Sequence, residues 1–275
     1  MRGPSGTGHS IQLTVAGRGN LGRSLARALP ARLVPARSGF RLPREGVLFL
    51  AVPDDAVRDM AARIAELKPP RALAVVHASG ALGLDALDAL PNNPRGSFHP
   101  LQSFPAPRAP SAFHGITVAT DATSPTLERL LGAIARKLGA KPRHVGDKER
   151  VLYHAAAVFA SNFVDVVIAE AVGLLGNIGW SEKESLDALL PLVEGAVSNI
   201  RRRGPVGAMT GPIRRGDAET VERHMALMDR PDLYRMLALV ALEIAQQAGL
   251  EPAAVERTRR ALTRNVAATR RRSGG

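Results

Sequence analysis

The stretch Leu13–Leu29, LTVAGRGNLGRSLARAL, decides how the beginning of the chain is expected to fold. Its three glycines, Gly17, Gly19 and Gly22, have the spacing G-x-G-x-x-G. An apolar and partly β-branched run precedes them, and Leu21, Leu25 and Leu29 are spaced four residues apart, as on one face of a helix. The stretch therefore predicts a strand, a tight glycine turn and a helix.

A glycine turn in this position has two interpretations. It is either a purely structural turn or a dinucleotide-binding loop, in which the glycines allow the turn, the approach of a pyrophosphate and close packing of the helix. The N-terminus of the helix would then offer free N–H groups and a positive dipole to the phosphates. The strand–turn–helix context favours the second interpretation, with these expected cofactor-binding residues: Gly17, Arg18, Gly19, Asn20, Leu21 and Gly22.

The residues that follow the loop indicate which dinucleotide is bound. NAD sites place an acidic residue about 20 positions after the first glycine, where it binds the ribose 2′-hydroxyl. This chain has Arg37 there, followed by Ser38, and has no acidic residue between Gly17 and Glu45. Because an arginine can bind a 2′-phosphate with two hydrogen bonds, we predict NADP(H) rather than NAD(H). The alternative is that Arg37 is a solvated loop residue and that Arg18, Arg41 or Arg44 binds this phosphate.

Short apolar runs alternate with helical patterns through the first half of the chain. This alternation predicts an α/β Rossmann domain with a doubly wound, mainly parallel sheet. The expected strands lie at residues 11–16, 32–35, 47–52, 73–76, 96–99, 116–119 and 143–145, and helices are expected at 54–68 and 125–138.

The second half of the chain has helical periodicity and no strand-like run, which predicts an all-α domain. Helices are expected at 151–175, 182–201, 218–228, 233–248 and 252–266. We therefore expect a disordered leader at 1–10, a Rossmann domain at 11–147, a helical substrate and dimerisation domain at 148–266, and a basic disordered tail at 267–275.

Composition excludes several classes of function. The net charge is +12, but seven arginines with no acidic residue after Glu256 account for +7 of it, so a specific nucleic-acid interface is not expected. The chain has no cysteine and no clustered histidine–acid set in the sequence, so we expect no metal. It also has no run of about 18 apolar residues, so we expect no membrane span and a cytoplasmic location.

Six segments occur in an order that resembles a known family. They are VAGRGNLG, LFLAVPDDAV, HASGALG, SFHPLQSF, LYHAAAVFASNF and MTGPIRRGD. The chain resembles two-domain Rossmann-like proteins with a C-terminal domain of unknown function, which are relatives of pyrroline-5-carboxylate reductase, ketopantoate reductase and deazaflavin-dependent NADP reductase. The resemblance implies a helical domain of the 6-phosphogluconate-dehydrogenase type, a homodimer formed through that domain, and an active site in a cleft between the domains.

Loops after the expected parallel strands supply further candidate residues, because ligands bind at the carboxyl ends of such strands. In related reductases the segment with Val52 and Pro53 lines the cofactor. His77 and Ser79 either reach the nicotinamide or make hydrogen bonds within their loop, and His99 is either a catalytic group or a structural histidine. Gln102 is a candidate substrate-binding residue.

One expected helix carries an unusual polar stripe. His154, Ser161, Asn162 and Asp165 fall on one helical face, which either faces a catalytic cleft or makes interdomain hydrogen bonds. The catalytic Lys-x-x-x-Asn pair of the 6-phosphogluconate-dehydrogenase relatives is absent. We therefore expect His154 to donate the proton and Asn162 to orient the substrate, with His99 and Ser161 as further catalytic candidates.

The segment MTGPIRRGD adds Thr210, Arg214 or Arg215, and Asp217, which are expected to close over the substrate, and an arginine there suits a substrate carboxylate. The alternative for Asp217 is that it caps the helix that follows. Together these residues predict an NADP-dependent oxidoreductase that transfers a hydride to a C=O or C=N carbon of a small substrate, with ketopantoate as a candidate. The alternative is a non-catalytic NADP-binding regulator or redox sensor.

Overall fold

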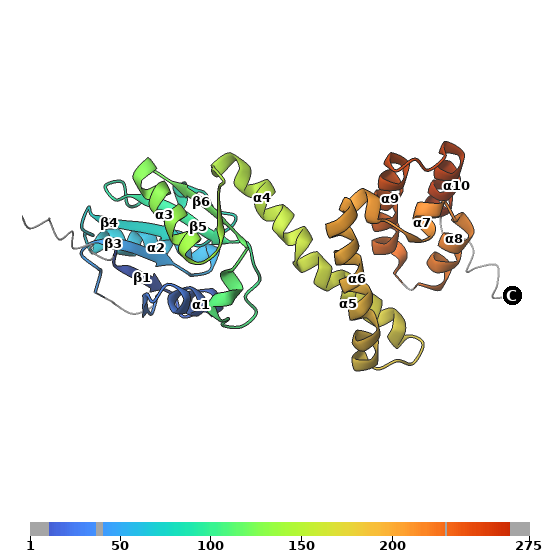
Figure 1. Ribbon diagram of the computed structural model, residues 1–275, viewed down its shortest axis with the longest axis horizontal. Coiled ribbons are helices and arrows are strands. Elements are labelled where there is room, and N and C mark those ends of the chain that lie inside the picture. Colours follow the sequence, from blue (N-terminus) through green and yellow to red (C-terminus); the bar gives the residue numbers. More distant parts are fainter. Residues whose placement is uncertain (1–10, 37–40, 229, 265–275) are drawn as a thin grey trace, which may run out of the picture. The chain divides into compact units, whose positions relative to one another are not determined.

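The computed structural model describes residues 11–36, 41–228 and 230–264 (Figure 1). The expected leader at 1–10 and tail at 267–275 lie outside the described residues. The chain forms two compact units that meet between Val164 and Asp165. This division comes later than the expected boundary at residue 147, because the helix that follows residue 146 packs its first turns on the sheet.

The first unit is built on one seven-stranded sheet with the order β2-β1-β3-β4-β5-β6-β7. Every pairing is parallel except the antiparallel pairing of β5 with β6, so the predicted doubly wound, mainly parallel sheet is confirmed. The strands are β1 (Leu13–Ala16), β2 (Arg32–Val34), β3 (Gly46–Leu50), β4 (Leu73–His77), β5 (Arg95–Pro100), β6 (Thr117–Ala122) and β7 (Lys141–His144).

Helices cover both faces of this sheet (Figure 1). On one face α1 (Asn20–Ala28) and α3 (Pro125–Lys137) pack on Phe49 and Phe98, whose rings meet edge to face at 5.4 Å. On the other face α2 (Asp54–Glu66) and the 3₁₀ turn η1 (Leu84–Leu87) pack on Leu48 and Leu50. Neighbouring residues of β3 thus point to opposite cores, which explains why its sequence is apolar throughout. A second 3₁₀ turn, η2 (Pro110–Phe113), adds Phe113 to the first core.

The strand directions create two functionally different edges of the sheet. β1, β2, β3, β4 and β5 are mutually parallel, so their carboxyl ends lie at one edge. β6 and β7 run the other way, so β6 ends level with the start of β5, and the last residue of β7, His144, lies level with Phe98 of β5. The glycine loop after β1 lies at the first edge, where doubly wound sheets bind ligands.

The second unit is entirely helical in its described residues, as predicted. Its core is formed by Val221, Met225, Leu242 and Leu262, among others. Its helices are α5 (Asn162–Gly176, which begins just before the boundary), α6 (Glu182–Ala208), α7 (Gly211–Arg215), α8 (Ala218–Leu227), α9 (Pro231–Gln247) and α10 (Pro252–Thr263). The short α7 was not predicted, and α6 extends beyond residue 201 across a non-helical Gly204 with φ of 70°.

The single helix predicted for 151–175 is wrong. The structure has α4 (Asp147–Ala160) and α5, separated by Ser161 with φ of −130° and ψ of −79°. The combined segment, Asp147–Gly176, is long and apolar enough to cross a membrane by length and composition alone. Apolar helices of soluble assemblies meet the same criterion, so the expected absence of a membrane span stays a prediction.

Candidate functional site

The glycine loop has a backbone that only glycine accommodates. Gly17 has φ of +125°, and a Cβ atom on it would lie 2.1 Å from the carbonyl oxygen of Ala51. A Cβ on Gly22 would lie 2.0 Å from the carbonyl oxygen of Gly17. The first glycine therefore allows β1 to turn beside the end of β3, and the third allows α1 to pack close against the turn.

The N-terminus of α1 is open to a ligand. Gly19 is its N-cap, no side chain caps the helix, and its first turn contains no acidic residue. A Cβ atom on Gly19 would meet no described atom within 4 Å, so the space in front of the loop is free. Uncapped N–H groups at a helix N-terminus attract anions, and a loop with this geometry fits the pyrophosphate of a dinucleotide.

The other predicted loop residues have identifiable roles. Asn20 donates from Nδ2 to the carbonyl oxygens of Phe104 (3.1 Å) and Pro105 (2.9 Å), so its side chain fixes the loop after β5. The Leu21 side chain packs partly on the core. Arg18 is exposed, and its carbonyl oxygen accepts a hydrogen bond from Nε of Arg23. Only the backbone of Asn20 and Leu21 remains available to a phosphate.

The residues expected to select NADP(H) are only partly described. Arg37 and Ser38 lie outside the described residues. The alternatives Arg18, Arg41 and Arg44 are all exposed. Selection of the 2′-phosphate by any of these arginines therefore stays a prediction.

The loop after β3 lies next to the glycine loop. The backbone N–H of Ala51 donates to the carbonyl oxygen of Ala16, and the backbone N–H of Ala78 donates to that of Leu50. Val52 is half-buried and Pro53 is exposed at the start of α2, with Asp54 in the first helical turn. Val52 and Pro53 thus lie between the glycine loop and the loop after β4, as their predicted contact with a cofactor requires.

The predicted cofactor contacts of His77 and Ser79 are wrong. His77 has no exposed surface, and its Nε2 atom is hydrogen-bonded to the carbonyl oxygen of Gly83 at 3.2 Å. The Ser79 hydroxyl is 5% exposed and accepts hydrogen bonds from the N–H groups of Ala81 and Leu82. Both side chains stabilise the loop after β4 from within, which was the alternative interpretation from the sequence.

A buried arginine, not predicted from the sequence, holds this part of the sheet together. Arg150 of α4 has no exposed surface. Its guanidinium donates to the carbonyl oxygen of Ser79 (3.4 Å), to the Ser97 hydroxyl and to the carbonyl oxygen of Val145 (3.1 Å). These acceptors belong to three different segments, so Arg150 fixes the start of α4 against the ends of β4 and β7.

Two predicted catalytic histidines meet at the same edge of the sheet. His99, near the end of β5, and His154 of α4 have ring centroids 6.4 Å apart. A Cβ atom on Gly80 would lie 2.8 Å from Nε2 of His99 and 2.9 Å from Nδ1 of His154. Nδ1 of His154 is buried and has no hydrogen-bond partner among the described residues. The missing side chain of Gly80 thus makes room for two imidazoles.

Tyr153 completes this cluster, which we call the His99–His154 cluster and define as His99, His154, Tyr153 and Gly80. The Tyr153 hydroxyl is hydrogen-bonded to Nδ1 of His99 at 2.8 Å. Burial, with the nearby charges of His154 and Arg150, lowers the pKa of His99 to about 4. Burial raises the pKa of Tyr153 to about 12. Both groups are therefore neutral at pH 7, and the pair can offer a hydrogen bond to a substrate.

The remaining predicted site residues do not join this cluster. Because the chain leaves helical geometry at Ser161, the single polar face expected for His154, Ser161 and Asn162 is wrong. Gln102 is exposed, and its Oε1 accepts a hydrogen bond from the N–H of Ser103. Thr210 and Arg215 are the N-cap and last residue of α7 in the second unit, and their contact with a substrate stays a prediction. Asp217 caps α8, as the alternative interpretation proposed.

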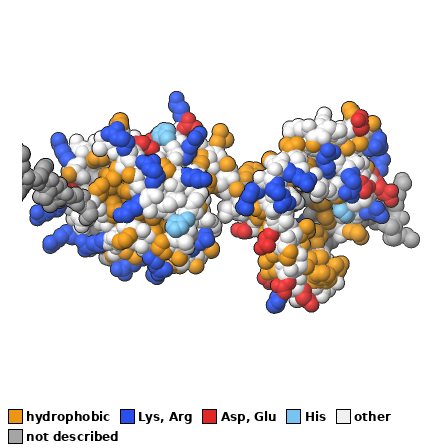
Figure 2. Space-filling model, in the orientation of Figure 1, with side chains coloured by type: hydrophobic (Ala, Val, Ile, Leu, Met, Phe, Trp, Pro, Cys, Tyr) orange, Lys and Arg blue, Asp and Glu red, His pale blue; other side chains and the backbone are white. Residues whose placement is uncertain are grey.

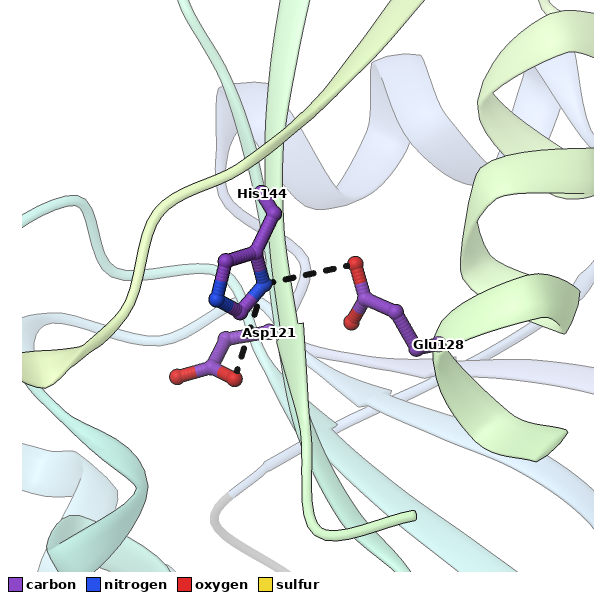
Figure 3. Close-up of side chains that lie close together, drawn as sticks. All are labelled: Asp121, Glu128 and His144. Carbon is purple, nitrogen blue, oxygen red and sulfur yellow. Dashed lines mark ion pairs between the residues drawn. The ribbon is translucent and has the colours of Figure 1, made fainter. Parts of the chain in front are cut away.

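The fold also forms one histidine–acid cluster that the sequence analysis did not find. Asp121, Glu128 and His144 each place a ligand atom within 4.8 Å of the others (Figure 3). They come from β6, α3 and β7, on the β7 side of the sheet, and Asp121 pairs with Ser97 of β5, level with the last residue of β4. No short sequence spacing joins them, so only the tertiary fold could identify the group.

Comparisons with known proteins agree with this description. Residues 116–244 match the model of a domain of unknown function (DUF2520). None of the curated proteins compared matches the chain significantly. A crystal structure from Bacteroides fragilis, described as a candidate NADP oxidoreductase, is similar with a TM-score of 0.73 and 23% identity, covering 86% of this chain and 98% of that one.

Two further solved structures share the architecture. A protein from Thermotoga maritima has a TM-score of 0.68 and 23% identity, covering 86% of this chain and 99% of that one. Pyrroline carboxylate reductase from Plasmodium falciparum, solved with NADP bound, has a TM-score of 0.54 and 13% identity, covering 92% and 99%. The chain therefore has the fold expected from the sequence resemblance: a Rossmann-like domain followed by a helical domain, with residues 116–244 matching the domain of unknown function (DUF2520).

Proposed function

We propose that the protein is an NADP(H)-dependent oxidoreductase. The observation that carries this proposal is the glycine loop, in which the strained Gly17 and the open, uncapped N-terminus at Gly19 form a backbone cradle for a pyrophosphate. Two similar solved structures are described as NADP proteins, one of them with NADP bound. NADPH bound along this edge would supply a hydride to the substrate.

The order of the strands supports the path of the cofactor. β1, β3, β4 and β5 are neighbours, and the segments after them place, in this order, the glycine loop, Val52 and Pro53, Gly80, and His99 along one edge. A dinucleotide held by its pyrophosphate at the glycine loop would extend along this row. Its nicotinamide would then approach the His99–His154 cluster.

The chemistry of the cluster fits reduction of a C=O or C=N bond. Reduction leaves negative charge or a basic nitrogen that needs a proton. His99, neutral at pH 7, acts as a hydrogen-bond donor to the substrate, held in place by the Tyr153 hydroxyl. His154, whose buried Nδ1 atom has no partner in the described part of the chain, supplies the proton.

The substrate class follows from charge. Arg215, exposed on α7, is the candidate for pairing with a carboxylate, so small keto acids and cyclic imino acids are the compounds to test, with ketopantoate among them. We further propose that this is a cytoplasmic protein without a specific nucleic-acid partner.

We also propose that the second unit mediates a homodimer. No residue of α5 is buried. Its large apolar side chains Phe163, Val166 and Leu174 are each at least 43% exposed. Apolar side chains of α6 and α9 are exposed as well, and Figure 2 shows such side chains on the surface of this unit. Exposed large apolar side chains in this number are typical of a protein interface.

Turnover with variants separates an enzyme from a non-catalytic NADP-binding protein. Keto acids and imines are incubated with NADPH and the protein, and oxidation of the nicotinamide is followed by its absorbance. An enzyme loses turnover in His154→Ala while its affinity for NADPH is retained. If no compound is turned over by the NADPH-bound wild type, the regulatory alternative is favoured.

A further inference from the structure

We propose that Asp121, Glu128 and His144 form a binding site for a divalent transition-metal ion, and that Zn²⁺ is the ion it takes. The site lies on the β7 side of the sheet, where Asp121 pairs with Ser97 of β5, level with the last residue of β4, and the proposal does not rest on the proposed reductase activity. We call it the β6–β7 cluster. Its three protein ligands would join β6, β7 and α3 and would leave one coordination position of a tetrahedral ion for water.

The distances within the cluster fit one shared ion. Nδ1 of His144 lies 3.6 Å from Oε1 of Glu128 and 3.9 Å from Oδ1 of Asp121 (Figure 3). Two ligands of one tetrahedral zinc ion lie about 3.4 Å apart, given zinc–nitrogen and zinc–oxygen bonds of about 2.1 Å. Both distances are longer than a direct hydrogen bond. The three side chains therefore do not satisfy one another's hydrogen-bonding atoms, and an ion could bind between them.

An unsatisfied oxygen faces the same group. Oε2 of Glu128 is buried and has no hydrogen-bond partner among the described residues. The Asp121 residue is only 8% exposed, and its Oδ2 atom takes part in no hydrogen bond in the described part of the chain. A buried carboxylate oxygen without a partner is unfavourable, and a bound cation would satisfy that of Glu128.

Neighbouring groups orient the proposed ligands. The Thr120 hydroxyl donates to Oε1 of Glu128 at 2.7 Å, and the N–H of Ala122 donates to Oδ1 of Asp121 at 2.8 Å. Such outer hydrogen bonds hold ligands in place in metal sites. The elements are rigid as well, because Thr120 pairs with His144 across β6 and β7, and the Ser124 side chain caps the start of α3.

The chemistry of the donor set selects the ion. Imidazole nitrogen combined with carboxylate oxygen is typical of zinc, whereas Mg²⁺ and Ca²⁺ prefer oxygen ligands alone. The His144 side chain is 64% exposed, so an ion can enter from solvent, and the two acids lie deeper. The alternative is that a protonated His144 forms an ion pair with both acids, with no metal.

Calorimetric titration distinguishes these possibilities. The full chain, without a histidine tag and treated with a chelator, is titrated with ZnCl₂ and, separately, with MgCl₂. We expect one Zn²⁺ per chain, at least tenfold weaker binding in His144→Ala, and no change in the control His114→Ala, which removes an exposed histidine of the same unit. Absence of zinc binding in the wild type, or equal binding in His144→Ala, would overturn the proposal.

Two further variants keep the test independent of folding. Glu128→Gln preserves the size of the side chain and is expected to weaken zinc binding at least tenfold, with unchanged circular dichroism. Thr120→Val removes the hydroxyl that orients Glu128 and is expected to weaken binding about tenfold. Zn²⁺ should also raise the melting temperature of the wild type but not of His144→Ala. An equal rise in both proteins would show that zinc binds elsewhere.

Discussion

Nδ1 of His99 and the hydroxyl oxygen of Tyr153 lie 2.8 Å apart and join the end of β5 to α4. The two rings meet edge to face with centroids 5.6 Å apart. Since the pKa of His99 is about 4 and that of Tyr153 about 12, the pair is a hydrogen bond between neutral groups at pH 7. The hydroxyl therefore fixes the orientation of the imidazole.

Replacement of Tyr153 by phenylalanine tests this orientation. We expect Tyr153→Phe to lower the free energy of unfolding by about 1 kcal/mol and to lower kcat, because His99 loses the partner that fixes its ring. The control is Tyr234→Phe, which breaks a similar hydrogen bond to Nδ1 of His224 (3.0 Å) in the second unit. An unchanged kcat in Tyr153→Phe would exclude the positioning role.

Gly80→Ala tests whether the imidazoles of His99 and His154 both lie against Gly80, in the space that a side chain would fill. The new methyl group would lie within 3 Å of both rings, so the rings must move while the backbone stays folded. We expect altered NMR signals of His99 and His154 with a change in melting temperature of only a few degrees. Gly195→Ala, where a Cβ meets no described atom within 4 Å, is the control. Histidine signals identical to those of the wild type would contradict the described geometry.

The glycine loop predicts different losses of stability for two similar variants. Gly17→Ala forces a Cβ against the Ala51 carbonyl at a φ of +125°, and we expect a loss of stability of about 2–4 kcal/mol. Gly19→Ala has free space and a φ of −67°, so stability should change by less than about 0.5 kcal/mol. Chemical denaturation measures both values, and equal destabilisation would contradict the structure of the loop.

Buried histidines predict how stability depends on pH. The pKa values of His77 and His99 are lowered to about 4 from 6.5, chiefly by burial, so between these values the unfolded chain binds more protons than the folded one. The free energy of unfolding should therefore be largest above pH 6.5 and fall as the pH decreases toward 4, by at most about 1.4 kcal/mol per pH unit for each histidine.

Urea denaturation at several pH values between about 4.5 and 7.5 measures how steeply the free energy of unfolding changes with pH. The variant His99→Gln should have a smaller slope than the wild type, because one of the two histidines no longer titrates. His114→Ala, which removes an exposed histidine, should keep the slope of the wild type. A slope that is the same in His99→Gln would show that His99 is not buried in its neutral form.

The proposed dimer predicts sensitivity to charge on α5. Val166 is 47% exposed, and Val166→Glu would place a carboxylate in the interface, so we expect a shift from dimer to monomer. Light scattering coupled to size-exclusion chromatography measures the mass. Leu67→Glu, at the end of α2 in the first unit, should leave the dimer intact. A monomeric wild type would contradict the proposal.

Local pattern was sufficient to predict most of the fold. The seven strands and the helix after the glycine loop were all predicted, and β1, β3 and β4 are encoded by short runs of apolar residues followed by a turn. The break at Ser161 was missed, because apolar residues continue on both sides of it. Nothing in local periodicity distinguishes one long helix from two.

The candidate site was predicted only where one segment carries it. Gly17 and Gly19 could be identified from their spacing, and His99 and His154 from their residue type. Arg150 and Tyr153 were missed, because their importance depends on burial and on partners more than 50 residues away in the sequence. His77 was misassigned for the same reason, since its burial inside the sheet depends on the packing of neighbouring strands.

Binding of the dinucleotide is the measurement that tests the central claim most directly. Calorimetric titration of the wild type and Gly19→Ala with NADPH and NADH should give tighter binding of NADPH to the wild type, and binding at least tenfold weaker to Gly19→Ala with an unchanged melting temperature of the free protein. At 100 times its Kd, NADPH should stabilise the wild type by about 2.7 kcal/mol. Absence of binding of either dinucleotide to the wild type, or equal affinities of the wild type and Gly19→Ala, would contradict the account.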